Sequence, residues 1–329
     1  MRMILFITWG TAMKLKYLLS ALFVLSIVSL FIGVKDITPL DLFSLTEEQK
    51  QIFIVSRIPR LMSILLAGAS LSIAGLIMQQ LSRNKFVSPT TAGTMDSASL
   101  GILVAILLFP AATLLHKTVI AFLFALIGTF IFMKILDSIK YKDAIFIPLV
   151  GLMFGGIVGA VTTFFAYKYD LLQTISTWMH GDFSVILKGR YELLYISIPL
   201  VLVAYLFADR FTVAGMGEDF SLNLGLPYKQ VVRVGLAIVA LIAAVVVLTV
   251  GMLPFLGLII PNLVTMYRGD HLRGNISHTA LLGSVFVLAC DIIGRIILYP
   301  YEISIGLVVG VIGSAIFLYM LIRRKAYEA

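Results

Sequence analysis

An uncharged run of 21 residues, Leu61 to Leu81, constrains this chain more than any other feature. Arg57 and Arg60 precede the run, and a short basic turn follows it before a second apolar run begins. A helix of about 20 apolar residues crosses a bilayer core of about 30 Å, because each residue adds about 1.5 Å. The pattern therefore predicts a helical hairpin in a membrane, which excludes most soluble functions.

The composition extends this interpretation to the whole chain. Hydrophobic residues make up 60% of the 329 residues and charged residues 13%, with a mean hydropathy of +1.05. Soluble domains carry about 25% charged residues. The net charge of +8 is scattered over the ends of the apolar runs, so it indicates topology rather than a nucleic-acid surface. We expect an all-α polytopic membrane protein with one transmembrane domain over 1–329, in which residues 1–13 form an N-terminal extension.

Charges and helix breakers divide the chain into ten expected spans. The uncharged stretch from Val234 to Met266 is 33 residues long, which is too long for one crossing. Gly251 and Pro254 divide it, and Pro261 indicates that its second half is a short span that is broken or tilted. The expected spans are 17–34, 58–81, 90–115, 118–136, 145–167, 191–208, 234–251, 253–266, 279–299 and 303–322.

Ten spans place both termini on one side of the membrane, and the basic residues indicate which side. With the N-terminus inside, the inner segments hold 16 of the 25 Lys and Arg residues, which favours cytoplasmic termini. Arg57, Arg60 and Arg295 then lie outside, against this bias. A carboxylate of a partner protein would explain them, because the arginine fork binds a carboxylate in two places. Contact with lipid headgroups is the alternative explanation.

The sequence lacks the patterns of nucleotide, metal and redox chemistry. No GxxxxGK[ST] motif is present, so ATP that drives this chain must bind to another subunit. The four histidines are divided between the two sides, and Cys290 is the single cysteine. We therefore expect no metal site, internal disulfide, cofactor or catalytic residue on this chain.

Few ionisable groups fall inside the expected spans. Asp96 lies about two turns into the third span, where it either lines a pathway or bonds to a neighbouring helix. Asp291 and Arg295 share one face of the ninth span, and either pair with one another or act in transport. Glu302 opens the tenth span, where a carboxylate also suits a helix N-terminus.

Glycines recur at four-residue spacing on two of the spans. Gly151, Gly155 and Gly159 share one face of the fifth span, and Gly306 and Gly310 share one face of the tenth. Such faces let helix backbones approach closely. They either pack inside the bundle or line a pore or a subunit seam.

The inner loop 214–233 carries a helical pattern of its own. Glu218 begins a short helix that contains Leu224, Gly225 ends it, and Pro227 begins another turn. We expect two short helices at the inner surface. The loop is either an amphipathic surface segment or a docking surface for a partner.

Several motifs occur in the order that one known family shows. The chain resembles the permease subunits of ABC importers for ferric siderophores, haem and vitamin B12, from about Lys14 to Arg324. One such motif alone is weak, but linked motifs in order are specific. The segments that carry the resemblance are RIPR, GLIMQQLSRNKFVSPTTAG, GEDFSLNLGLP, GMLPFLGLIIP, DHLR, CDIIGR and EISIGLVVGVIGSAIFLYML.

The resemblance implies an ABC importer type II permease fold in a bacterial cell membrane. Two such subunits, identical or different, would enclose a pathway. Two cytoplasmic ATPase subunits would bind the 214–233 loop, and an extracytoplasmic binding lipoprotein would dock outside. The implied positions are Arg57, Arg60 and Arg295 for docking, Glu218, Leu224, Gly225 and Pro227 for ATPase coupling, and Asn84, Phe86, Asp96, Gly155, Gly159, Gly306 and Gly310 for gate or pathway.

Within the family, the segment SRNKFVSPTTAGTMDSASLG is most similar to permeases for iron–catecholate siderophores of the petrobactin type. Haem or cobalamin import is the alternative within the family. An ion-coupled secondary transporter is the alternative outside it, and its carboxylate relay would have to use Asp96 and Asp291. A membrane enzyme or scaffold is a third class.

Four residues depart from the family pattern. Asn262 and Thr265 stand where the family often has His and Arg, and Ile303 and Ser304 replace a frequent Leu-Pro. They leave open the local geometry at the inner end of the eighth span and at the outer entry to the tenth.

Overall fold

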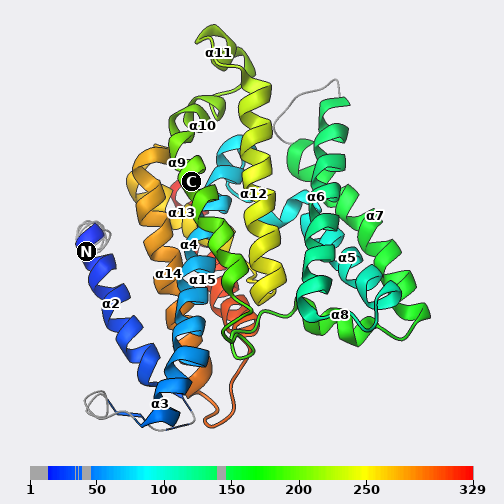
Figure 1. The fold of residues 1–329 in the computed structure, drawn as a ribbon. Helices are drawn as coiled ribbons and strands as arrows, with labels where there is room; N and C mark the ends of the chain where they lie inside the picture. Colours follow the sequence, from blue (N-terminus) through cyan, green and yellow to red (C-terminus); the bar gives the residue numbers. More distant parts are fainter. Residues whose placement is uncertain (1–13, 34, 36, 39–45, 139–145, 329) are drawn as a thin grey trace.

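The computed structural model describes residues 14–33, 35, 37–38, 46–138 and 146–328, which form a bundle of helices (Figure 1). The expected extension, residues 1–13, lies outside the described residues. The apolar helices are α2 (Leu15–Phe31), α4 (Ile58–Leu81), α5 (Thr94–Leu108), α6 (Leu114–Ser138), α7 (Phe146–Lys168), α9 (Ser197–Leu206), α12 (Tyr228–Val250), α13 (Leu256–Arg268), α14 (Leu272–Ile296) and α15 (Ile305–Glu328). The shorter elements are α3 (Glu47–Ile52), a π-helical turn (Phe53–Arg57), α8 (Leu172–Met179), α10 (Ala208–Ala214), α11 (Glu218–Asn223) and two 3-10 turns (Pro89–Ala92 and Glu192–Ile196).

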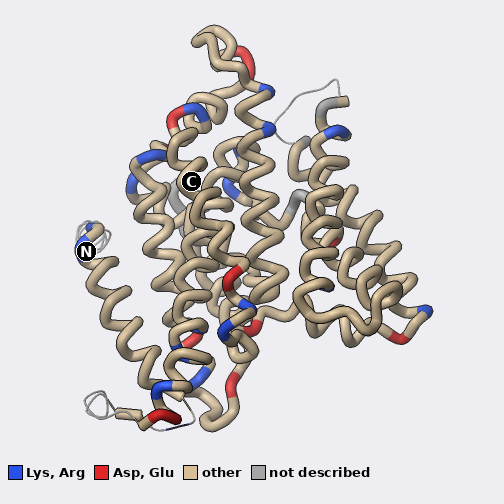
Figure 2. Tube along the Cα trace, viewed as in Figure 1, with Lys and Arg blue, Asp and Glu red and all other residues tan. Residues whose placement is uncertain are grey.

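These apolar helices correspond one to one with the expected spans, which confirms the multi-pass membrane fold. Six helices are long and apolar enough to cross a bilayer alone, and the bent pair α9–α10 with its preceding turn makes a seventh. Charged residues occur mainly near the two ends of the helices (Figure 2). This distribution follows from the cost of placing charge in hydrocarbon.

Helix α4 lies at the centre of the bundle, against α12, α13 and α14. It approaches its neighbours closely because small residues line its contact faces. A methyl group added at Gly75 would lie 1.9 Å from the carbonyl oxygen of Gly257, and one at Gly68 would lie 2.9 Å from that of Gly283. In a bilayer the hydrophobic effect does not favour helix association, because the lipid tails are as apolar as the side chains. Dispersion energy from such close backbone contact therefore stabilises the bundle.

The second span is longer than the sequence analysis predicted. Helix α3, the π turn and α4 form a continuous helical segment of 35 residues from Glu47 to Leu81. Thr46 and Gln49 form a reciprocal capping box at its start. At about 1.5 Å per residue this segment exceeds the bilayer core by about 20 Å, so its first turns project beyond the membrane.

The sixth span is bent, which the sequence analysis did not predict. The segment Glu192–Leu206 and helix α10 meet at 61°. The expected second helix of the 214–233 loop is also wrong, because Pro227 directly precedes the first turn of the long helix α12. Helix α11 is therefore the single short helix between α10 and α12 (Figure 1).

The division of the long uncharged stretch between α12 and α13 is confirmed. Helix α12 ends at Val250, and Gly251 follows with a φ of 78°. Helix α13 has 13 residues and contains Pro261. A helix of that length measures about 20 Å, so α13 does not cross the bilayer core alone.

Candidate functional site

Five charged side chains meet where α4 begins and α14 ends, at the end of the bundle that the sequence analysis expects to lie outside, and we call them the outer charge cluster. The members are Arg57, Arg60, Asp291, Arg295 and Glu302. Three elements supply them, namely the α3–α4 segment, α14 and the segment before α15. Their packing brings together distant parts of the chain, since the bonded residues Arg60 and Glu302 lie 242 positions apart.

Arg60 bridges the two acidic members of the cluster. Its Nη2 donates to Asp291 Oδ1 at 2.8 Å, and its Nη1 donates to Glu302 Oε2 at 2.7 Å. Arg295 binds the other oxygen of Asp291, so both oxygens of this buried carboxylate carry a guanidinium. The predicted pairing of Asp291 with Arg295 is confirmed. Glu302 lies three residues before α15 and pairs with Arg60, so it does not open the helix as expected.

Arg57 and Arg295 also bind the C-terminal end of α2. Arg57 donates to the carbonyl oxygens of Leu30, at 2.5 Å, and Lys35, at 2.6 Å. Arg295 donates to the carbonyl oxygens of Ser29 and Ile32, both at 3.0 Å. The last carbonyls of a helix have no intrahelical partner and carry partial negative charge, so two guanidinium groups stabilise this end.

The three arginines therefore have partners within their own chain. Arg57 and Arg295 are only 8% and 6% exposed, so the subunit buries them instead of presenting them on its outer surface. The side chains of Arg60 and Glu302 are more accessible, at 14% and 26%. Internal carboxylates and carbonyls account for the three positive charges at this end of the bundle without a partner protein. A docking role stays a prediction.

The two expected gate residues lie in the turn after α4. Asn84 Oδ1 accepts a hydrogen bond from the backbone N–H of Phe86 at 2.9 Å, which stabilises the turn. The Phe86 ring is half exposed and lies edge-on to Phe317 of α15, with ring centroids 6.0 Å apart. Phe317 in turn stacks on Phe255, which precedes α13.

Two amides fix the end of α4 and the turn after it to the short helix α13. Pro261 has no N–H, so the carbonyl of Gly257 lacks its helical donor. Gln79 Nε2 lies 3.5 Å from that oxygen and donates to the carbonyl of Leu258 at 3.0 Å. Asn262 Nδ2 donates to the carbonyl of Lys85 at 2.6 Å. Asn262, which departs from the family pattern, thus bridges α13 and the turn.

Asp96 meets the glycine face of α7. A methyl group added at Gly155 would lie 2.4 Å from Asp96 Oδ2, and one at Gly159 would lie 3.2 Å from Oδ1. The glycines therefore make room for a carboxylate from α5 inside one subunit. Gly156, on another face of α7, has nothing within 4 Å of such a methyl group. The structure brings three predicted pathway residues together, as an α5–α7 contact.

The glycine face of α15 also packs inside the subunit. The N–H of Gly306 donates to the carbonyl of Gly181 at 3.0 Å. A methyl group added at Gly310 would lie 3.5 Å from Pro254. These glycines thus set the distance between α15 and two loops, and a neighbouring face of α15 exposes Leu307 and Val311.

Helix α11 lies at one tip of the bundle (Figure 1) and contains Glu218, and the other three expected coupling residues, Leu224, Gly225 and Pro227, follow directly after it. Gly225 has a φ of 74°, so its predicted role in ending the helix is confirmed. Leu224 is exposed, together with three other large apolar side chains. These four residues, Met216, Phe220, Leu222 and Leu224, are 48% to 61% exposed.

The sequence analysis missed several residues of these sites. Gln79 stood in a quoted motif without a role, although Pro261 in a helix signals a carbonyl that needs a donor. The capping box at Thr46 was also visible as Thr-Glu-Glu-Gln. Ser29, whose hydroxyl accepts from Arg295 at 2.5 Å, carries no signal in the sequence.

Comparison with known proteins agrees with this geometry. The FecCD transport family matches residues 21–323, which covers most of the chain. The chain belongs to the FecCD transport family. This assignment explains the order of the motifs quoted above, and it confirms the expected class of membrane transport protein.

Two relatives illustrate how similar FecCD members are to this chain. The petrobactin import system permease protein YclN of Bacillus subtilis is 65% identical over 96% of this chain and 100% of the relative. The ferric-anguibactin transport system permease protein FatD of Vibrio anguillarum is 39% identical over 92% of this chain and 96% of the relative.

A solved structure shows the same fold. It is described as an inward-facing conformation of a metal-chelate type ABC transporter, and it covers 94% of this chain and 98% of its own with a TM-score of 0.83. Its sequence identity is 22%. The expected type II importer permease fold is confirmed.

The outer charge cluster should contribute strongly to stability through Asp291. Asp291→Asn removes the charge that two arginines share, and it leaves those buried cations poorly compensated. We expect the free energy of unfolding to fall by about 3 kcal/mol or more, because breaking a buried ion pair costs about 3–5 kcal/mol. Thermal unfolding of the purified chain in detergent would measure it. Glu48→Gln, which breaks an exposed pair with Lys35, is the matched control and should change little. An unchanged midpoint for Asp291→Asn would contradict the role given to the cluster.

Proposed function

We propose that this chain is a permease subunit of an ATP-driven importer of ferric siderophores. The observation that carries the proposal is its 65% identity, over 96% of the chain, to a petrobactin import system permease. The anguibactin permease supports the same substrate class at 39% identity. A vitamin B12 import system permease of Vibrio cholerae is less similar, at 30%, which favours siderophore over cobalamin import.

The proposed importer works as a dimer of permease subunits in a bacterial cell membrane. The outward faces of α7 and α15 supply large exposed apolar side chains, including Met153, Ile157 and Val311, for a subunit seam or pathway wall. Both termini are cytoplasmic in this proposal, as the excess of basic residues on inner segments suggests. The ion-coupled alternative is weaker, because Asp291 already binds two arginines and is a poor proton relay.

Iron uptake tests the proposed function. Cells that lack their own siderophore permeases should take up ferric petrobactin when they express this chain with its ATPase and binding protein. A variant ATPase that cannot hydrolyse ATP should abolish uptake, and the purified chain alone should hydrolyse no ATP, because it has no phosphate loop. Uptake of cobalamin but not ferric siderophores would overturn the substrate class. ATP-independent uptake would overturn the transport mechanism.

We also propose that α11 binds the ATPase subunit. Its exposed apolar side chains are a surface that a partner would bury, and a helix this short depends on correct termination. Gly225 ends the helix with positive φ, and a methyl group there would have nothing within 4 Å. A substitution at this position therefore acts through backbone conformation rather than through a clash.

Two variants of one residue test this coupling surface. Gly225→Val should reduce siderophore uptake at least about tenfold, because a β-branched residue strongly disfavours φ > 0. Gly225→Asn is the control and should retain most of the uptake, because Asn tolerates the left-handed region. Protein in the membrane and ATPase co-purification would be measured for both. Equal uptake by the two variants would contradict the coupling role of this turn.

Docking of an extracytoplasmic binding protein is proposed at Arg60. Arg60 and Glu302 are the accessible members of the outer charge cluster, whereas Arg57 and Arg295 hold α2. An acidic side chain of the partner would bind Arg60 in competition with Glu302. Arg57 and Arg295 would then support docking indirectly, because they keep the surrounding backbone in place.

Neutral substitutions separate docking from stability. Glu302→Gln keeps the Arg60–Asp291 pair but frees one edge of Arg60, so it should strengthen binding of the partner protein. Arg60→Gln should weaken that binding several-fold, and added salt should reduce the difference. The exposed Lys50→Gln is a control for general charge effects. Wild-type affinity of a folded Arg60→Gln variant at physiological salt would refute the docking role.

A further inference from the structure

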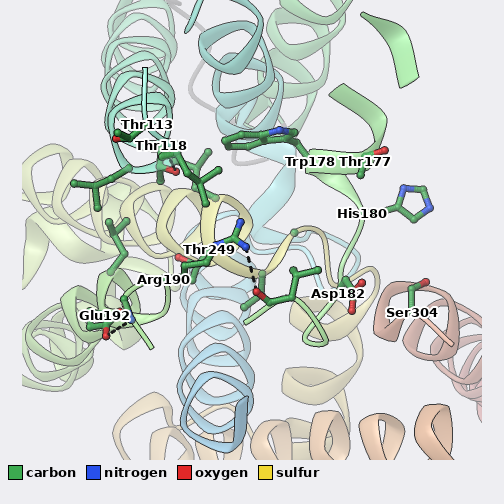
Figure 3. A pocket seen from close by; sticks show the side chains of 18 of the residues that line it. Thr113, Thr118, Thr177, Trp178, His180, Asp182, Arg190, Glu192, Thr249 and Ser304 are labelled. Carbon is green, nitrogen blue, oxygen red and sulfur yellow. Dashed lines mark hydrogen bonds between the residues drawn. The ribbon is translucent and has the colours of Figure 1, made fainter. Parts of the chain in front are cut away.

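A cavity of 720 Å³ opens near the outer end of the bundle, apart from the outer charge cluster. Figure 3 shows that its labelled side chains come from several elements. The walls come from the start of α6, from α8 and the segment after it, and from the last turn of α12. Its volume lies in the range of about 300–1,000 Å³ that is typical of small-molecule sites.

Three threonines offer hydrogen-bond acceptors to this cavity. The hydroxyls of Thr118, Thr177 and Thr249 donate to carbonyl oxygens of their own helices at 3.0, 2.8 and 2.7 Å. A hydroxyl has one hydrogen and two lone pairs. Because each hydrogen is already engaged with the backbone, these oxygens are available to a ligand only as acceptors.

Two carboxylates add negative charge to the same cavity. Asp182 accepts the N–H of Ser184, and Glu192 accepts the N–H of Gly189, both at 2.7 Å. Each of these bonds uses one oxygen of a group that has two. The aromatic face of Trp178 lies on the opposite wall and attracts cations as well (Figure 3). Acceptors, carboxylates and an indole together favour an ammonium group.

One cationic side chain, Arg190, also lines the cavity and offsets the negative charge of the two carboxylates. It is exposed, and the bond from Nη1 to the carbonyl of Val185 is long, at 3.3 Å. A guanidinium has five N–H donors, so most of its capacity is open to an anion. Its planar fork matches a phosphate. A ligand with an ammonium and a phosphate a few bonds apart would satisfy both sides of the cavity.

An apolar stripe on α6 leads from the cavity along the membrane-spanning length of the helix. Leu115 lines the cavity and begins the stripe. The side chains that follow on the same face recur every three or four residues, and together with Leu115 they are 45% to 66% exposed. The stripe consists of Leu115, Val119, Leu123, Ile127 and Phe130. A soluble ligand would not contact this apolar stripe, whereas an acyl chain would pack along it.

We propose that this cavity binds the headgroup of a zwitterionic phospholipid of the outer leaflet. The phosphate lies on Arg190, which Figure 3 shows between the two carboxylates, and the ammonium lies between Trp178 and Asp182. The acyl chains follow the α6 stripe into the bilayer. The position of Trp178 agrees with this arrangement, because tryptophan is enriched at the membrane–water interface.

The lipids that the purified chain retains test the proposed site. The full chain would be reconstituted into nanodiscs of equal parts phosphatidylethanolamine and phosphatidylglycerol, released into detergent, and examined by native mass spectrometry. We expect wild type to retain phosphatidylethanolamine about tenfold over phosphatidylglycerol, because only the former carries an ammonium. Asp182→Asn with Glu192→Gln should abolish this preference. The amide oxygens of that double variant can still accept the two backbone N–H bonds.

Controls keep the result specific to the cavity. Asp170→Asn, on the same outer side but outside the cavity, should retain the wild-type preference. If the double variant does not fold, Thr249→Val serves instead, because it removes one acceptor with little change of shape and should reduce the preference several-fold. Equal retention of the two lipids by wild type would overturn the proposal. An unchanged preference in the folded variants would overturn it as well.

A soluble competitor distinguishes a lipid from a free solute. Phosphoethanolamine has the same headgroup chemistry but no acyl chains, so it should displace bound phosphatidylethanolamine only at concentrations about a hundredfold higher than a short-chain lipid requires. Displacement at equal concentrations would assign the cavity to a soluble zwitterion and overturn the lipid proposal.

Discussion

The structure depends on satisfying backbone groups that lipid cannot solvate. A free carbonyl in hydrocarbon costs several kcal/mol, so each helix end or break inside the membrane needs a donor from the protein. Side chains supply such donors at two places in the structure. Arg57 and Arg295 donate to the last carbonyls of α2, and Gln79 donates to the carbonyls before Pro261 in α13. All three donors come from other elements, so they tie short or broken helices to the long ones.

The same constraint explains the outer charge cluster. Arginines that bind the end of α2 bring positive charge into a partly buried place, and a buried charge needs compensation. Asp291 supplies it from the face of α14, and Arg60 links Asp291 to the accessible Glu302. The cluster thus connects α2, the α3–α4 segment, α14 and the start of α15. A structural role for its buried part is compatible with a docking role for its accessible edge.

Much of the fold could be predicted because membrane helices can be recognised in a sequence from its charge and hydropathy. The run Leu61–Leu81 and the break at Gly251 each carry a local physical signal, and the structure confirms both. The bend between α9 and α10 has no such signal, because neither proline nor glycine lies at the junction. The long helical extension before α4 did have a capping-box signal, but its polar composition placed it outside any expected span.

The sequence by itself determined the membrane class, the division of the chain into apolar helical segments and the motifs of the family, because each follows from residues close together in the chain. Only the tertiary structure decided what the isolated polar residues contact. Asp96 meets the glycine face of α7, and Arg57 and Arg295, two of the three arginines that lie against the positive-inside bias, meet carbonyls at the end of α2. Such partners lie far apart in sequence, and the packing angle and rotation of each helix determine which of them come into contact. Local sequence patterns do not specify those two quantities.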